Sequence, residues 1–168
     1  MIQINAQLTF RDYLHYSYHH FFRRPITKIY LGLFIPIVCW EVYKISVDYD
    51  SGIGLIWLTL PGIFLISLAS IYVQAKSVFK SSKAHHELIA YTFTENFIFI
   101  KSESLQSELK WDTFIKVVET NKLFIFNTTT RSALLIPKAS FETINKMEEL
   151  RALIRSKPEL KHKLKTSA

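Results

Sequence analysis

The chain has 168 residues, of which 49% are hydrophobic and 21% are charged, with a mean hydropathy of +0.13, four glycines and one cysteine. These proportions exclude a disordered chain and a domain built on disulfides. The formal net charge of +7 is compatible with an anionic partner. Because the hydropathy is high for a soluble domain of average length, the location of the apolar residues decides the fold class.

Residues 1–25 are predicted to contain a strand followed by a helix. Apolar and polar side chains alternate from Ile2 to Leu8, which indicates a half-buried strand. Thr9 is typical of a helix N-cap and Asp12 stands at the acid position of a capping box, so we expect a helix over residues 10–24. This helix is rich in aromatic residues, which suit either the headgroup layer of a membrane or packing against a folded domain.

A two-helix transmembrane hairpin is predicted over residues 26–75. Residues 53–73 contain no charged side chain and, as a helix, would cross a hydrocarbon layer of about 30 Å. The core helix of a soluble protein is the alternative. A weaker apolar stretch at residues 26–46 contains Glu41 and Lys44, which are spaced to form an ion pair. The role of Glu41 is left open.

The distribution of basic residues predicts the orientation of this hairpin. Lysine and arginine are concentrated before and after the two apolar stretches, whereas the loop between them carries Asp48 and Asp50. The positive-inside rule then places both termini in the cytoplasm. The candidate contacts with anionic lipid are Arg23, Arg24, Lys76, Lys80 and Lys83.

Residues 84–157 are predicted to form a separate α+β domain. Short alternating runs separated by turns predict strands at residues 88–93, 97–100, 105–111, 114–118, 123–126 and 133–136. Ser140 is predicted to cap a helix with Phe141 and Ile154 on its apolar face, ended by Pro158. An antiparallel sheet of about six or seven strands closed by a C-terminal helix is the plan of a pleckstrin-homology-like (PH-like) domain. Residues 158–168 are interpreted as a solvated basic tail.

Signals for catalysis are weak. Glycine occurs only at positions 32, 52, 54 and 62, so residues 84–157 have no glycine loop for a phosphate and no nucleophile elbow. His15 and His19 have a spacing that a metal can use, but aromatic packing is the favoured interpretation. Cys39 lies in the first apolar stretch and is interpreted as an apolar side chain. We therefore expect no enzyme, no catalytic, cofactor or metal site, and no nucleic-acid partner.

Three segments carry a resemblance to a known family: residues 8–13 (LTFRDY), 110–120 (KWDTFIKVVET) and 133–141 (ALLIPKASF). With two apolar spans, they are similar to the bacterial YcxB-like proteins. The candidate family-motif residues are Trp111, Pro137, Lys138 and Phe141. Ala139 departs from the pattern, because the family usually has arginine there. The resemblance implies a multi-pass protein of the bacterial cytoplasmic (inner) membrane with a cytosolic PH-like domain, and it implies no activity.

Two hypotheses of function follow. The first is a membrane-anchored, non-enzymatic interaction module that binds a protein partner or anionic phospholipid, held to the bilayer by the juxtamembrane lysines and the basic tail. The alternative is an immunity or protective membrane protein that acts against a toxin or bacteriocin. A homo-oligomer is compatible with both hypotheses. Ion transport is disfavoured because the predicted spans offer only Glu41 as a charge within the membrane.

Overall fold

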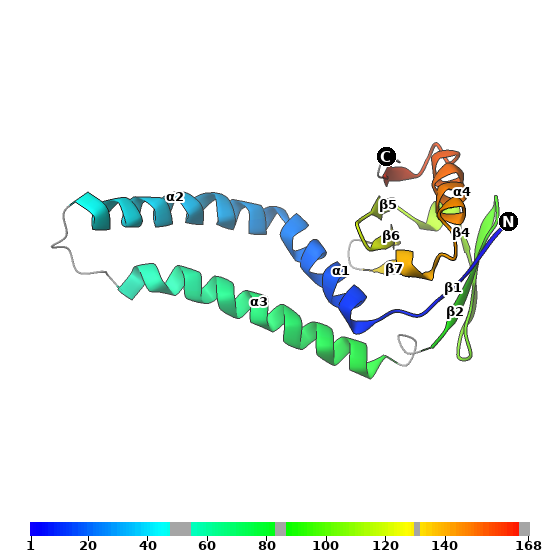
Figure 1. Cartoon of the computed structure of the whole chain (residues 1–168), viewed down its shortest axis with the longest axis horizontal. Helices are drawn as coiled ribbons and strands as arrows, with labels where there is room; N and C mark the ends of the chain where they lie inside the picture. The colour runs from blue at the N-terminus through cyan, green and yellow to red at the C-terminus, as the bar shows by residue number, and fades with distance from the viewer. Residues whose placement is uncertain (48–54, 83–86, 130–131, 165–168) are drawn as a thin grey trace. The chain divides into compact units, whose positions relative to one another are not determined.

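The computed structural model describes residues 1–47, 55–82, 87–129 and 132–164 (Figure 1). The described residues form four α-helices and eight strands, and the strands make two four-stranded sheets. The chain separates into two compact units. We call residues 1–13 with 79–168 the β unit, and residues 14–78 the helical unit.

Sheet 1 has the strand order β1-β2-β3-β4, with every neighbouring pair antiparallel. Its strands are β1 (Ile2–Ala6), β2 (Ile89–Phe93), β3 (Phe97–Lys101) and β4 (Gln106–Lys110). The side chains of Ile2, Ile4 and Ala6 are buried and alternate with exposed polar residues, as the sequence predicted for this strand. The sequence did not predict which strand pairs with β1. Its partner is β2, which lies more than 80 residues further along the chain.

Sheet 2 has the order β7-β6-β5-β8. Strands β5 (Lys116–Glu119), β6 (Leu123–Asn127) and β7 (Ala133–Pro137) are antiparallel neighbours, and β8 (Lys161–Lys163) pairs with β5 in parallel. The six strands predicted between residues 84 and 157 are confirmed as β2 to β7. The expectation of one continuous sheet is wrong, because a 3-10 turn at Trp111–Thr113 follows β4, and β5 then pairs with β6 and β8.

One hydrophobic core joins both sheets to helix α4 (Ile144–Arg155). Phe93 of sheet 1 and Phe126 of sheet 2 have ring centroids 6.0 Å apart, and both side chains are fully buried. Leu150 and Ile154 of α4 are also fully buried in this core. Burial of each such side chain contributes about 2 kcal/mol to folding, so the contacts between the sheets and α4 hold the β unit together.

Helix α4 begins later than the sequence predicted. Its N-cap is Thr143, whose hydroxyl accepts a hydrogen bond from the Lys146 backbone, so the assignment of Ser140 is wrong. Lys138–Ser140 form a 3-10 turn, and Phe141 after it is extended with its ring buried in the core. Packing of this ring therefore sets where the helix starts. The segment predicted to be a solvated basic tail contains a strand, because Lys161–Lys163 form the exposed strand β8.

Helix α1 (Phe10–Arg23) has the predicted N-terminus. The Asp12 amide donates to the Thr9 hydroxyl over 3.2 Å, and the Thr9 amide donates to the Asp12 carboxylate over 3.3 Å, which is a reciprocal capping box. Several aromatic side chains of α1 contact helix α3. In the β unit, the Phe10 ring lies 5.7 Å from that of Phe79, and in the helical unit the Tyr18 hydroxyl donates to the Leu68 carbonyl over 3.3 Å.

Helices α2 (Pro25–Val47) and α3 (Leu55–Ser81) correspond to the two predicted apolar spans. The ring of Tyr30 on α2 stacks on Phe64 of α3 with centroids 5.8 Å apart. Within the described residues, Gly62–Ser81 is long and apolar enough to cross a membrane, and only 11% of this stretch is buried; the apolar part of α2, Pro25–Trp40, is shorter. By length and composition alone, α3 could therefore cross a membrane. The predicted Glu41–Lys44 pair lies outside the described side chains.

Removal of β1 should destabilise the β unit strongly. We expect a protein in which an Asn-Gly linker replaces residues 9–86 to fold, because Ala6 and Ile89 are direct partners in sheet 1 and such a linker suits an antiparallel turn. Residues 87–168 alone should be less stable by more than about 3 kcal/mol, since burial of Ile2 and of Ile4 contributes about 1.5–3 kcal/mol each. Urea unfolding followed by circular dichroism compares the two, and equal stability would show that β1 is dispensable.

Candidate functional site

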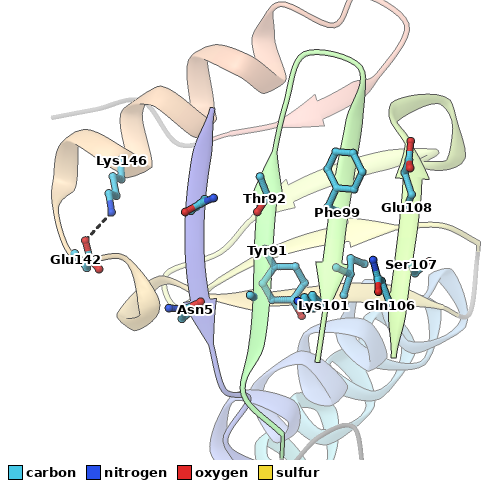
Figure 2. Close-up of a pocket in the computed structure, with 13 residues that line it drawn as sticks. Asn5, Tyr91, Thr92, Phe99, Lys101, Gln106, Ser107, Glu108, Glu142 and Lys146 are labelled. Carbon is cyan, nitrogen blue, oxygen red and sulfur yellow. Dashed lines mark hydrogen bonds and ion pairs between the residues drawn. The ribbon is translucent and has the colours of Figure 1, made fainter. Parts of the chain in front are cut away.

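The outward face of sheet 1 carries an open hollow of about 620 Å³ (Figure 2). The strand register arranges the outward side chains of this face in two rows across the four strands. One row is Gln3, Thr92, Phe99 and Glu108, and the other is Asn5, Ala90, Lys101 and Gln106. We call this hollow the sheet 1 groove.

Differences in side-chain size explain the shape of the sheet 1 groove. The outward residues of β2, Ala90 and Thr92, are small, whereas those of the strands on either side are longer. Strands lie about 4.8 Å apart, so the backbones of β1 and β3 that carry the two walls are about 10 Å apart. Phe99, which stands in the β3 wall, is 40% exposed. The groove therefore offers amide and hydroxyl groups together with one exposed aromatic ring.

The charges around the sheet 1 groove nearly balance. Lys146 and Glu142 form an ion pair of 2.6 Å beside β1, and hydrogen bonding to Lys146 lowers the pKa of Glu142. Lys101 and Glu108 stand on neighbouring strands at diagonal positions. With two basic and two acidic side chains, the groove is suited to a polar partner without a large net charge. The described residues contain no group of three metal-binding side chains here or elsewhere.

Tyr91 is among the residues that line the groove, but its side chain is buried in the hydrophobic core. Burial raises the pKa of Tyr91 to about 12, since the phenolate would lose its hydration in the core. Its side chain is therefore a neutral part of the hydrophobic core at physiological pH and offers no general base to the groove.

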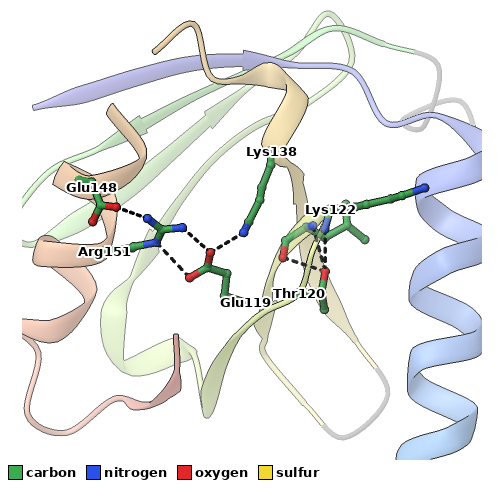
Figure 3. A network of polar contacts seen from close by, with 7 residues as sticks. Glu119, Thr120, Lys122, Lys138, Glu148 and Arg151 are labelled. Atoms are coloured by element: carbon green, nitrogen blue, oxygen red, sulfur yellow. Dashed lines mark hydrogen bonds and ion pairs between the residues drawn. The ribbon is translucent and has the colours of Figure 1, made fainter. Parts of the chain in front are cut away.

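A second polar feature lies inside the β unit, where Glu119 is the centre of a buried charge network (Figure 3). The Glu119 side chain is fully buried at the end of β5. Arg151 of α4 donates to both of its carboxylate oxygens, with Nε to Oε2 at 3.1 Å and Nη2 to Oε1 at 2.6 Å. Lys138 forms an ion pair with Oε1, and Glu148 forms one with Arg151. Hydrogen bonding to Glu119 raises the pKa of Arg151.

The network joins three separate parts of the chain. Glu119 lies on β5, Lys138 begins the 3-10 turn after β7, and Arg151 lies on α4. The Lys138 amide also donates to the Lys122 carbonyl over 2.8 Å, which ties this turn to the β5–β6 connection. Two basic and two acidic side chains neutralise one another, so the network is built to hold the turn and the helix in place and has no cation left for an external anion.

All four predicted family-motif residues lie in or beside the core of the β unit. Trp111 is buried, and its indole nitrogen donates to the Thr94 carbonyl over 3.1 Å. Pro137 is buried at the end of β7, and the buried ring of Phe141 packs 5.5 Å from that of Phe124. Lys138 belongs to the charge network. These positions therefore have structural roles, which the sequence left undefined.

The candidate lipid contacts lie on the helices. Arg23 is the last residue of α1 and Arg24 follows it, both exposed. Lys76 and Lys80 are exposed one turn apart on α3, and Lys83 lies outside the described residues. The sequence patterns did not indicate Glu119, Arg151 or the residues of the sheet 1 groove as candidate site residues. One signal for Arg151 was available, because it interrupts the apolar face of α4 next to Leu150 and Ile154.

A model of the family described as YcxB-like protein matches residues 93–154. The match lies within the β unit, from the last residue of β2 to the penultimate residue of α4, and it contains both Glu119 and Arg151. Residues 93–154 therefore form a YcxB-like domain, which confirms the family indicated by the sequence motifs. No curated protein and no solved structure matches the chain.

Replacement of Glu119 by alanine should destabilise the β unit by about 3–5 kcal/mol, because Arg151 and Lys138 would keep buried charges without their partner. Glu148→Ala is the matched control, since the Glu148 side chain is 37% exposed and its loss should cost less than about 1 kcal/mol. Denaturant unfolding of the full chain in detergent, followed by tryptophan fluorescence, measures both. Similar effects of the two substitutions would contradict a central role for Glu119.

Proposed function

We propose that the protein is a membrane-anchored, non-enzymatic interaction module of the bacterial inner membrane. In this proposal, α2 and α3 cross the bilayer as a hairpin with both termini in the cytoplasm. The YcxB-like domain is then a cytosolic PH-like module, in which two packed sheets are closed by α4. The partner is a protein that binds in the sheet 1 groove, and anionic lipid contacts Arg23, Arg24, Lys76, Lys80 and Lys83.

The observation that carries the anchoring proposal is the pairing of β1 with β2. These strands are neighbours in one sheet, and helices α1 to α3 lie between them in the chain. A folded sheet lies on one side of a membrane, so a chain that leaves at Ala6 and returns at Ile89 crosses the membrane an even number of times. If Gly62–Ser81 crosses, a second crossing is required, and α2 is the remaining long apolar helix among the described residues.

The properties of α2 are compatible with this second crossing. A helix of 23 residues extends for about 34 Å at 1.5 Å per residue, which matches a hydrocarbon layer of about 30 Å. Large apolar side chains along α2 are exposed, among them Ile29, Leu33 and Trp40. Lipid chains would cover such side chains without any further protein contact.

The sheet 1 groove supports the interaction part of the proposal. It contains hydrogen-bonding side chains, an exposed ring and charged side chains of both signs, and the described residues hold no metal-binding cluster there, a composition that suits recognition. Its β1 wall belongs to the strand that leads into α1, so the partner would bind to the part of the domain that is directly connected to the membrane hairpin.

The topology can be tested with single cysteines in a Cys39→Ala background. We expect Asp50→Cys to react with a membrane-impermeant maleimide in intact spheroplasts, and Glu95→Cys to react only after the membrane is disrupted. Asp50 lies between the two proposed spans, and Glu95 is exposed in the β2–β3 turn. Labelling of Glu95→Cys in intact spheroplasts would contradict a cytosolic β unit.

The binding face can be tested by filling the sheet 1 groove. Ala90→Tyr should place a ring over the floor between the two walls and abolish co-purification of a partner from native membranes. Glu95→Tyr adds the same ring at an exposed turn and should leave the partner bound. Quantitative mass spectrometry of the two variants and the wild type gives the comparison. An identical set of co-purified proteins for all three would contradict binding in the groove.

A further inference from the structure

Strand β8 brings basic residues next to a basic residue of β5. In the parallel register, Lys161 is the partner of Lys116, and Lys163 is the partner of Val118. All residues of β8 are exposed, and Lys116 is half-buried. Side chains at directly paired positions, and at positions two residues apart, share one face of a sheet. Lys116, Lys161 and Lys163 therefore form a basic cluster at one edge of sheet 2, which we call the lysine edge.

The lysine edge is electrostatically unfavourable by itself. Like charges directly opposite each other in a sheet destabilise the pairing. None of the three lysines forms an ion pair with another described residue. Backbone pairing with β5 holds β8 in place, and so do the side chains at its two ends, because Leu160 is buried and Leu164 packs against the hydrophobic core. The ladder and these apolar contacts thus favour the pairing of β8 with β5, while the like charges of Lys161 and Lys116 oppose it.

We propose that the lysine edge binds the phosphate groups of an anionic bilayer and that this binding stabilises β8 on β5. Phosphate oxygens accept charge-assisted hydrogen bonds from ammonium groups, and phosphates between Lys116 and Lys161 would remove the repulsion. The inference rests on the proposed membrane anchoring, since a tethered domain meets the lipid surface at a high effective concentration. Lys116 thereby joins the candidate lipid contacts, although the sequence did not indicate it. The pairing of β8 with β5 then depends on anionic lipid.

The test uses the full chain in nanodiscs of phosphatidylcholine, with or without one third of phosphatidylglycerol. Amide hydrogen exchange of the peptide that covers residues 160–164 is measured by mass spectrometry. We expect exchange of β8 to be slower by about threefold or more in the anionic discs, because its local opening becomes less frequent. High salt should abolish the difference, since screening weakens contacts between exposed charges.

The variant Lys161→Gln tests whether repulsion between Lys161 and Lys116 is the reason that β8 exchange depends on anionic lipid. In phosphatidylcholine discs, its β8 amides should exchange more slowly than those of the wild type, because the charge opposite Lys116 is gone. Its exchange should then change little when anionic lipid is added. The matched control is Lys110→Gln, which removes an exposed lysine from β4 of sheet 1 and should leave the lipid response of β8 as in the wild type.

Three other results would overturn the inference. Equal exchange of β8 in the two kinds of disc would show that anionic lipid does not stabilise the strand. Protection by inorganic phosphate in phosphatidylcholine discs, equal to that by phosphatidylglycerol, would assign the lysine edge to a soluble anion. A faster exchange in Lys161→Gln would show that the lysine supports the pairing. Failure of the chain to co-elute with discs would instead contradict the proposed anchoring, so the two proposals fail in distinguishable ways.

Discussion

The pairing of β1 with β2 is the constraint on which the remaining architecture depends. Because Ala6 and Ile89 are neighbours in sheet 1, everything between them is an insertion whose two ends meet at one place. Thr9, three residues after the end of β1, caps the start of α1, and Phe79 near the end of α3 contacts Phe10. The β unit is thus linked along the chain to the helices through two strands that are neighbours in one sheet.

Two kinds of interaction stabilise the β unit. Aromatic and aliphatic side chains fill one core between the sheets and α4, and the charge network around Glu119 fixes the turn after β7 and the helix to each other. Replacement of such a network by apolar residues is often neutral, whereas loss of one partner is costly. The network therefore links α4 to β5 and to the turn after β7, while the core supplies most of the free energy of folding.

Much of the fold could be predicted from the sequence, because alternation, capping and apolar length are local signals. The strands β1 to β7 and the N-terminus of α1 follow from such patterns. The pairing of β1 across more than 80 residues and the division into two sheets depend on contacts between distant residues, which local periodicity does not contain. The sheet 1 groove was missed for the same reason, since Ala90 and Phe99 become neighbours of one hollow only when the register is known.

The discontinuous sheet also orders events during synthesis. When β1 leaves the ribosome its partner β2 does not yet exist, and α1, α2 and α3 must all be made before sheet 1 can form. If the two helices insert in the bilayer as a hairpin at this stage, the chain that follows them returns to the side of the membrane on which β1 lies. Without insertion, the side chains of Ile2 and Ile4 would be exposed to solvent and the edge of β2 would be unpaired. Such a state is prone to aggregation and to proteolysis. If α2 and α3 insert as proposed, sheet 1 therefore forms only after both helices have been made.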